Sequence, residues 1–305
     1  MEENNKKNFN AVVILGPTAS GKTSLAVQAA KALGGEIISA DSRQVYRELN
    51  LGSGKDLDEY DGIPYHLIDI CTLAEEYNVF NFQNDCLKAF DEIQRRGALP
   101  LIAGGTALYL NAILRDYQLV PVPENGALRE RLQTYSQEEL AALLLRLNPQ
   151  LHNKTDLEIR ERTIRAIEIA EYKGRQTETP LAKPNKIRAL VFKINFPRAL
   201  LRDRIKRRLR ARIDAGMIDE VTHILEKYGE QRVLRLGLEY KFTALYLQGA
   251  FLADEYFEKL YTAICQFAKR QETWFRKMQR EGVSMIELDG ENIETMVHTI
   301  LDKVR

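Results

Sequence analysis

The chain has 305 residues, of which 44 are Lys or Arg and 43 are Asp or Glu, so its formal net charge is +1. Hydrophobic residues make up 45% and charged residues 29%, a composition that is typical of folded globular proteins and excludes a disordered or fibrous chain. The length suggests about two domains, and the balanced charge argues against a broadly basic nucleic-acid coat protein, although an average can conceal a local basic patch.

Short apolar runs alternate with amphipathic segments in the first third of the chain. Strands are predicted at 11–15, 36–40 and 98–104, and helices at 22–33, 79–96 and 106–114. Strands that are separated by helices connect through right-handed crossovers into a parallel sheet. The first third therefore predicts an α/β domain.

The pattern changes at residues 121–126, PVPENG, a connector rich in proline and turn residues. From 126 to 173 only helical patterning follows. The chain is completed by a strand at 187–194, long helices at 198–215 and 255–281, and a short strand at 284–289. We therefore expect residues 117–183 to form an all-helical insertion in a core built from 1–116 and 184–305.

A phosphate-binding motif directly follows the first predicted strand. Its sequence, GPTASGKT, fits GxxxxGK[ST] between a strand and a helix, and it consists of Gly16, Pro17, Thr18, Ala19, Ser20, Gly21, Lys22 and Thr23. Backbone N–H groups and the helix N-terminus attract an anion there, and Lys22 adds a full positive charge. Thr23 offers a hydroxyl to Mg²⁺. The motif predicts a P-loop NTPase-like sheet and a loop that binds a diphosphate or triphosphate, as the nucleotide-binding loops of that fold do. It does not indicate which reaction follows.

Two carboxylates compete for a role beside this loop. Asp69 ends an apolar run, HLIDI, as the Mg²⁺-holding Asp of a P-loop kinase or ATPase does. Asp41 follows the strand predicted at 36–40, so it is expected at the carboxyl edge of the sheet, which the P-loop also occupies. Spacing alone fits Asp41 equally well to a functional role and to a helix N-cap.

Positive charge is concentrated in one predicted helix. Between residues 198 and 212 eight side chains are basic and one is acidic. Such a local field attracts phosphates whatever the net charge of the chain. A second basic stretch, 269–280, contains Trp274, which either stacks on a base or anchors the core together with Phe275.

No segment of the sequence predicts secretion or membrane insertion. The first ten residues, MEENNKKNFN, are polar, and the longest apolar runs are too short to span a bilayer. The three cysteines, Cys71, Cys86 and Cys265, are widely separated and form no CxxC motif, which argues against a zinc site and fits a reducing compartment. We therefore expect a cytoplasmic protein without a membrane partner.

Seven motifs, in order, resemble those of the tRNA dimethylallyltransferases (isopentenyl-diphosphate:tRNA transferases). They are GPTASGKT (16–23), SADSRQVY (39–46), PYHLIDI (64–70), IAGGTALYL (102–110), RERTIRAIEI (160–169), AGMIDEV (215–221) and AKRQETWFR (268–276). The resemblance runs over nearly the whole chain. It implies transfer of a dimethylallyl group from dimethylallyl diphosphate to N6 of an adenosine next to the anticodon of a tRNA.

The resemblance also implies roles for residues of the P-loop and its surroundings. The loop would hold an isoprenoid diphosphate with Mg²⁺ as cofactor, with Lys22 and Thr23 acting in catalysis and Thr23 as the metal ligand. Arg204 and Arg208 match the family pattern and lie four residues apart, on one helix face from which they could reach either the diphosphate or RNA phosphates. Asp41 matches the family's base, which accepts the proton of the adenine amine as the C–N bond forms.

A tRNA-binding surface is the third implication of the resemblance. It is carried over to Asp41, Ser42, Arg43, Gln44, Thr106, Leu128, Glu161, Arg162, Thr163, Ile164 and Arg165. The adenosine must leave the stack of the anticodon loop to reach Asp41, and Gln44 is placed to read its edge. For Thr106, capping of a helix is compatible with the same position. The expected partners are the anticodon loop of tRNA and dimethylallyl diphosphate, and the protein is expected to be a monomer.

The chain departs from the family pattern at three places. The usual Gly-Tyr-Lys-Glu is replaced by Glu239–Phe242, a Thr-Arg pair by Ile264–Cys265, and a Met by Arg212. These positions face RNA or support the substrate channel in the family, whereas the P-loop and Asp41 are intact. The departures therefore bear on tRNA specificity more than on the chemistry.

Two alternative functions stay open at this point. The first is prenyl transfer to a free adenine nucleotide, which uses the same chemistry but needs neither the basic helix nor the helical insertion. The second is a P-loop kinase for a small metabolite, in which Asp69 would matter more than Asp41.

Overall fold

The structure is a computed structural model, and it describes residues 9–117, 119–149, 151, 155–175 and 187–305. The chain divides into two compact units, one formed by residues 1–117 and 185–305 and the other by residues 118–184. The second unit begins and ends one residue later than the predicted insertion. Each unit is described below by itself.

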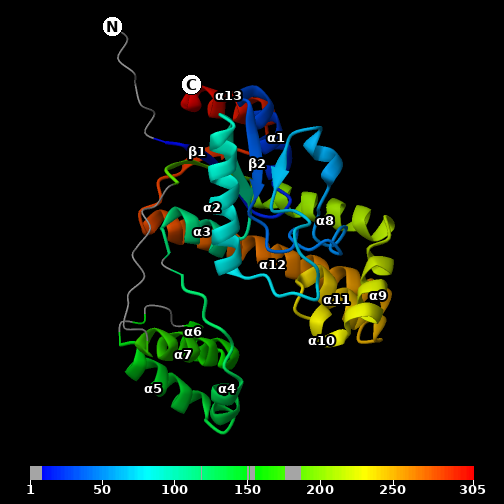
Figure 1. The fold of residues 1–305 in the computed structure, drawn as a ribbon. Coiled ribbons are helices and arrows are strands. Elements are labelled where there is room, and N and C mark those ends of the chain that lie inside the picture. Colours follow the sequence, from blue (N-terminus) through cyan, green and yellow to red (C-terminus); the bar gives the residue numbers. More distant parts are fainter. Residues whose placement is uncertain (1–8, 118, 150, 152–154, 176–186) are drawn as a thin grey trace. The chain divides into compact units, whose positions relative to one another are not determined.

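A six-stranded parallel sheet forms the centre of the first unit (Figure 1). Its strands are β1 (Ala11–Leu15), β2 (Gly35–Ser39), β3 (Tyr65–His66), β4 (Leu99–Gly104), β5 (Ala189–Asn195) and β6 (Ile286–Asp289). They are arranged in the order β3-β2-β4-β1-β5-β6. All five residues of β1 are fully buried, as expected for a continuous apolar run in a strand that is covered on both faces.

Helices cover both faces of the sheet, so the predicted fold class is confirmed. Because side chains alternate along a strand, Val13 and Leu15 of β1 face one layer and Val12 and Ile14 face the other. The first layer contains α2 (Val79–Arg95), α3 (Ala107–Leu114) and the C-terminal part of α12 (Ala253–Arg280). The second contains α1 (Lys22–Leu33) and α13 (Ile293–Val304).

Further helices of this unit pack beyond the sheet, and the first of them confirms the helix predicted at 198–215 (Figure 1). They are α8 (Arg198–Asp214), α9 (Met217–Tyr228), α10 (Glu230–Val233) and α11 (Leu238–Leu247), with a short 3₁₀ helix at Leu57–Tyr60. Glycines with positive φ mark the divisions at Gly216, Gly229 and Gly237. The sequence analysis also missed β3, because two residues are too few to show a strand period.

The described part of the second unit is all-helical. It contains α4 (Gly126–Leu132), α5 (Gln137–Leu147), α6 (Thr155–Glu158) and α7 (Arg160–Arg175). Their shared core consists of Leu128, Leu132, Leu140, Leu144 and Ile167. Arg160 donates hydrogen bonds to the carbonyl oxygens of Leu132, Gln133 and Tyr135, and it thereby satisfies groups that the end of α4 leaves without a partner in the helix.

No helix in the described part of the chain is both long enough and apolar enough to cross a membrane.

Candidate functional site

The loops after β1, β2 and β4 meet at the carboxyl edge of the sheet. Leu15 of β1 is in register with Gly104 of β4, and Ser39 of β2 is in register with Ala103. The backbone N–H of Ala40 continues the pairing by donating to the Ala103 carbonyl over 2.8 Å. A Cβ at Gly104 would lie 2.3 Å from the Ala40 carbonyl oxygen, so this close approach needs glycine. The register thus brings the P-loop, the Asp41 segment and the turn at Gly105 together.

The P-loop has the turned backbone that an anion-binding loop requires. Ala19 and Gly21 have positive φ values of 62° and 82°, and α1 begins directly afterwards at Lys22. The Lys22 ammonium folds back and donates to the Pro17 carbonyl over 2.7 Å. The Ser20 hydroxyl is buried and has no hydrogen-bond partner among the described residues. The loop therefore presents a helix N-terminus, a cation and a spare hydroxyl in one place.

Helix α8 brings two arginines onto this loop, as the sequence analysis predicted for Arg204 and Arg208. Arg204 Nε donates to the Ala19 carbonyl over 2.8 Å, and Arg208 donates to the Thr18 hydroxyl. The two side chains are four residues apart and thus lie on one face of the helix. Their diphosphate-binding role stays a prediction, but their position beside the loop is now established.

The charges at this edge perturb one another strongly. Burial, the Arg208 charge and, in the opposite sense, the Asp41 charge together lower the pKa of Lys22 to about 7. Burial and the neighbouring Arg212 lower the pKa of Arg208 to about 10. Burial is the larger cause of both shifts, and in each case a neighbouring arginine lowers the pKa further. An anionic ligand would relieve this repulsion.

Asp41 lies within the electrostatic reach of Lys22 and Arg208. Its side chain is half-buried, and its Oδ1 accepts a hydrogen bond from the Arg43 backbone N–H over 2.8 Å. A series of turns follows rather than a helix, so the N-cap interpretation of Asp41 is wrong. Thr106 likewise does not cap α3 with its side chain, and its hydroxyl instead accepts from the Ser42 N–H over 3.1 Å.

Gln44 is held by the protein at both ends of its amide. Its Oε1 accepts from the Ser39 hydroxyl over 2.9 Å, and its Nε2 donates to the Gly54 carbonyl over 3.1 Å. An amide oxygen has a second lone pair and the amide nitrogen a second hydrogen. Gln44 therefore has a fixed orientation and keeps the capacity for further bonds, and adenine recognition stays a prediction for it.

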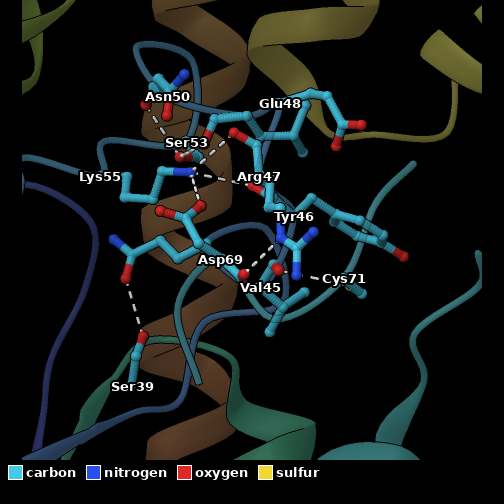
Figure 2. Close-up of polar contacts among 12 residues, drawn as sticks. Ser39, Val45, Tyr46, Arg47, Glu48, Asn50, Ser53, Lys55, Asp69 and Cys71 are labelled. Atoms are coloured by element: carbon cyan, nitrogen blue, oxygen red, sulfur yellow. Dashed lines mark hydrogen bonds and ion pairs between the residues drawn. The ribbon is translucent and has the colours of Figure 1, made fainter. Parts of the chain in front are cut away.

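The competing carboxylate, Asp69, takes part in a polar cluster with Lys55 and Arg47 (Figure 2). It forms an ion pair with Lys55, whose side chain is only 1% exposed. The Lys55 ammonium also donates to the carbonyls of Tyr46 and Arg47 over 3.1 and 3.3 Å, and Arg47 Nε donates to the Asp69 carbonyl over 2.9 Å. The Asp69 carboxylate thus neutralises the buried Lys55 cation, which argues against a role as the metal ligand of a kinase.

Comparison with known proteins agrees with this geometry. A sequence model described as IPP transferase matches residues 44–278. The chain belongs to this family. It is 55% identical to a tRNA dimethylallyltransferase 2 of Treponema denticola, over 90% of this chain and 94% of the relative. It is 53% identical to a tRNA dimethylallyltransferase 2 of Syntrophotalea carbinolica, over 92% and 94% of the two chains.

A solved structure shares the fold over the same extent. The crystal structure of a tRNA isopentenylpyrophosphate transferase from Bacillus halodurans superposes with a TM-score of 0.70 at 31% sequence identity. The alignment covers 97% of this chain and 96% of the other. Both units of this IPP transferase family member therefore have counterparts in a known structure.

Gln271 is a residue of the site that the sequence analysis missed. Its Oε1 accepts from the Thr18 N–H over 2.8 Å, and its Nε2 donates to the Gly105 carbonyl over 2.9 Å. It therefore ties the P-loop to the turn after β4, and it is only 5% exposed. A signal existed in the sequence, since Gln271 interrupts the apolar stripe of α12 between Ala268 and Phe275.

Two aromatic residues of the same helix, Trp274 and Phe275, differ in burial. Phe275 is fully buried, which confirms its predicted place in the core. Trp274 is 38% exposed, and the Lys277 ammonium lies 5.0 Å from its ring centroid. The core interpretation is therefore wrong for Trp274, because consecutive helical residues point about 100° apart.

The residues of the second unit that were predicted to bind tRNA fall into two groups. Leu128 and Thr163 are buried in the unit, and Ile164 packs against its core. Glu161 and Arg162 have exposed side chains. A buried side chain cannot reach an RNA without opening the core, so the prediction of direct contact stays open chiefly for the exposed pair.

Arg165 belongs to a buried ionic cluster inside this unit. It donates to Glu168 over 2.9 Å and to the Val122 carbonyl over 2.7 Å. Arg129 donates twice to the same carboxylate over 2.8 and 3.0 Å, and the Asn125 N–H donates to it over 2.9 Å. Burial by itself raises the pKa of Glu168, but these donors outweigh it and lower the pKa below its usual value. The cluster ties the start of α4 to α7.

A separate cavity of about 560 Å³ lies between β3 and α2. Residues that line it include Tyr65, His66, Tyr77 and Asp85, and none of the predicted site residues is among them. The perturbed charges and the convergent loops at the carboxyl edge of the sheet, rather than this cavity, mark the functional site.

Proposed function

We propose that the protein transfers a dimethylallyl group from dimethylallyl diphosphate to the N6 amine of an adenosine beside the anticodon of tRNA. The observation that carries this proposal is the placement of the Asp41 carboxylate at the sheet edge, in electrostatic reach of Lys22 and Arg208. A base and a diphosphate grip are thereby adjacent, as the reaction requires. The names of the relatives support the same activity.

The P-loop side of the site is suited to the donor. As the bond between the allylic carbon and the diphosphate oxygen breaks, negative charge grows on the diphosphate and must be met by fixed cations and N–H groups. Lys22 and Arg208 supply the charge, the N-terminus of α1 supplies N–H groups, and the buried Ser20 hydroxyl is free to bond a phosphate oxygen. These groups stabilise the leaving group.

Mg²⁺ fits this donor set. Mg²⁺ commonly takes one or two protein oxygens together with substrate phosphates, and the Thr23 hydroxyl follows Lys22 in the first turn of α1. Among the described residues no group of three or more His, Cys, Asp or Glu side chains forms an all-protein cage. Thr23 and the diphosphate would hold the ion, which would neutralise charge on the leaving group.

Asp41 is suited to the acceptor. The lone pair of the adenine amine is delocalised into the ring, so the amine is a poor nucleophile until its proton is taken. Asp41 would accept that proton while the nitrogen bonds to the allylic carbon and diphosphate departs, and such a base contributes about 10²–10⁴-fold. The adenosine would have to leave the stack of its loop to reach the carboxylate.

Transfer to a polynucleotide agrees better with the structure than the two alternatives. A metabolite kinase needs a second carboxylate for its metal, and Asp69 is engaged with Lys55. A free nucleotide needs neither the all-helical unit of residues 118–184 nor the basic surface of α8. The cytoplasm, where tRNA is modified, is the compartment that we propose, and the three cysteines are free thiols.

The test is a direct assay of the product. Purified protein is incubated with dimethylallyl diphosphate, Mg²⁺ and unmodified tRNA, and the tRNA nucleosides are analysed by mass spectrometry. We expect one adenosine of the anticodon loop to gain the mass of a dimethylallyl group. Unchanged adenosine, or modification of AMP in preference to tRNA when both are present, would refute the proposal.

The Asp41→Asn variant separates the base from the diphosphate grip. It should lose about 10²–10⁴-fold in transfer rate but bind Mg²⁺-diphosphate as the wild type does. Gln266→Leu, an exposed change on α12, serves as the matched control and should leave both quantities unchanged. Loss of diphosphate binding in Asp41→Asn would place Asp41 in the grip and contradict its assignment as base.

A further inference from the structure

One loop of the first unit, residues 50–54, lies between Gln44 and helix α9. Its Gly54 carbonyl accepts the hydrogen bond from Gln44 Nε2 over 3.1 Å. The loop is also bonded to itself, because the Gly54 N–H donates to the Leu51 carbonyl over 3.2 Å. A movement of the backbone at Leu51 is therefore passed on to Gly54, and from Gly54 to the Gln44 amide.

The carboxylate of Glu220, on α9, holds the 50–54 loop through its backbone. Its Oε2 accepts from the Leu51 N–H over 2.7 Å, and its Oε1 accepts from the Gly52 N–H over 3.1 Å. Tyr240, a buried residue of α11, donates its hydroxyl to Oε1 over 2.9 Å. A Cβ at Gly52 would lie 2.6 Å from the Tyr240 ring, so the loop also packs directly on this ring. Both carboxylate oxygens are thus engaged, and hydrogen bonds to a charged oxygen are stronger than those between neutral groups.

The Gly54 carbonyl determines which end of the Gln44 amide faces the loop. A carbonyl oxygen can only accept a hydrogen bond, so the NH₂ end of the amide must point toward it. The Ser39 hydroxyl donates to Gln44 Oε1 over 2.9 Å (Figure 2), but a hydroxyl can also accept and would tolerate either orientation. The amide keeps one N–H and one lone pair for a ligand. An amide uses this pair on adenine by donating to a ring nitrogen and accepting from the N6 amine.

The loop depends on Glu220 for this arrangement. Without the carboxylate, the N–H groups of Leu51 and Gly52 would lose the oxygens that they bond. A donor that is kept from water and loses its partner costs free energy, so the loop would turn to find other partners and would carry the Gly54 carbonyl with it. The orientation of Gln44 would then no longer be fixed.

We propose that Glu220 is a positioning residue for adenine recognition, which fixes the 50–54 loop so that Gly54 directs the Gln44 amide at the base. Gln44 then accepts one hydrogen of the N6 amine while Asp41 takes the other, and it donates to one of the two ring nitrogens that flank this amine, N1 or N7. Guanine carries an oxygen in place of the amine and offers Gln44 Oε1 no hydrogen. The inference rests on the proposed function, because it assumes that adenosine is the prenyl acceptor.

The test uses synthetic anticodon stem-loops whose target base is adenine, 7-deazaadenine or 1-deazaadenine. Each analogue lacks one ring nitrogen and keeps the N6 amine. Gln44→Leu has no amide and reports how each analogue alters the chemistry alone, because the reactivity of the amine is the same for every variant. Relative to Gln44→Leu, we expect one analogue to lower kcat/KM of the full-length wild type about three- to tenfold, the size of one hydrogen bond between neutral groups.

Glu220→Gln should lose most of this analogue effect. The Gln amide has one oxygen and turns an NH₂ group toward the second N–H of the loop, so the loop shifts. With the adenine stem-loop, kcat/KM should fall about tenfold, whereas the Kd for Mg²⁺-diphosphate should stay within about twofold of the wild type. The P-loop keeps its own contacts from Arg204, Arg208 and Gln271.

Glu226→Gln is the matched control, because it makes the same chemical change at an exposed position of α9. It should equal the wild type in the analogue effect, in kcat/KM and in the Kd for Mg²⁺-diphosphate. If Glu220→Gln does not fold, Glu220→Asp keeps the charge but withdraws the carboxylate by one methylene group. Glu220→Asp should then reduce the analogue effect in the same way.

Three results would overturn the inference. A folded Glu220 variant that keeps the full analogue effect would show that Glu220 does not orient Gln44. A weaker Kd for Mg²⁺-diphosphate in that variant would show general damage to the site. A wild type that responds to both analogues as Gln44→Leu does would show that Gln44 makes no bond to a ring nitrogen. A wild type that transfers nothing to tRNA would instead refute the proposed function, so the two failures are distinguishable.

Discussion

Binding of diphosphate should be coupled to the uptake of a proton at Lys22. The pKa of this ammonium is lowered to about 7 in the free protein by burial and by Arg208. Below pH 7 the charged form prevails, and above pH 7 the neutral amine prevails. A bound diphosphate stabilises the charged form and must therefore bring a proton with it at alkaline pH. Its affinity accordingly falls as the pH rises.

The magnitude follows from the titration of one group. With a pKa of about 7, roughly 3% of the free protein carries a charged Lys22 at pH 8.5, and each further pH unit costs about tenfold in affinity, or about 1.4 kcal/mol. Protons that the diphosphate itself exchanges on binding are subtracted with Lys22→Arg, which binds the same ligand but does not titrate in this range. Close to one proton should be taken up at pH 8.5, against about half a proton at pH 7.

Isothermal titration calorimetry measures this number directly. Mg²⁺-diphosphate is titrated at pH 7.5 and 8.5 in pairs of buffers with different ionisation enthalpies, and the dependence of the binding heat on that enthalpy gives the protons taken up. Lys22→Arg is the control, because a guanidinium stays charged at every pH used, and its affinity should be flat. The absence of proton uptake by the wild type at pH 8.5 would refute the assignment of the shift to Lys22.

Three further predictions concern the structure around the site and the helical unit. Gln271→Leu leaves the Thr18 N–H and the Gly105 carbonyl without their partner, and it should lower the free energy of unfolding in urea titrations by about 1–3 kcal/mol. The exposed Gln266→Leu should change that free energy by less than about 0.5 kcal/mol. Equal effects of the two variants would contradict the bridging role of Gln271. Gly104→Ala places a Cβ 2.3 Å from the Ala40 carbonyl oxygen and should lower the free energy of unfolding by about 1–3 kcal/mol. Gly174→Ala is the control and should not destabilise the protein, because a Cβ there meets nothing within 4 Å. A tolerated Gly104→Ala would show that the strand ends are free to move apart. The lowered pKa of Glu168 means that its ionised form stabilises the folded state above the unfolded pKa of about 4.3 and that this contribution is lost as the pH falls through the folded value. The hydrogen-exchange protection factors of α7, which are corrected for the intrinsic pH dependence of exchange, should therefore fall on acidification from pH 6 to 4 in the wild type and be low at both pH values in Glu168→Gln.

Local patterns were sufficient for the elements that depend on neighbouring residues. The P-loop lies between β1 and α1, where its spacing and its apolar strand placed it. The all-helical character of residues 126–173 followed in the same way from a helical period without strand signals. Where several helices follow one another, glycines with positive φ set the boundaries, at Gly216, Gly229 and Gly237.

The local sequence pattern could not assign roles that depend on residues far away along the chain. Asp41 and Asp69 were both candidates for the functional carboxylate. The structure distinguishes them, because Lys55, 14 positions before Asp69, forms an ion pair with the Asp69 carboxylate. Thr163 lies in a motif that matches the family and Leu128 falls near a further family contact, yet the packing of the helical unit buries both. Sequence spacing does not report which face of a helix its neighbours cover.

The sequence by itself determined the α/β class, the phosphate-binding loop and the family, because each is encoded in runs of adjacent residues or in their order along the chain. The tertiary structure alone decided which charges act on one another. Thr18 and Gln271 are 253 positions apart, and Arg208 reaches Thr18 from 190 positions away. The lowered pKa of Lys22 arises from such tertiary packing, because electrostatic energy depends on distance and burial in space and not on separation along the chain.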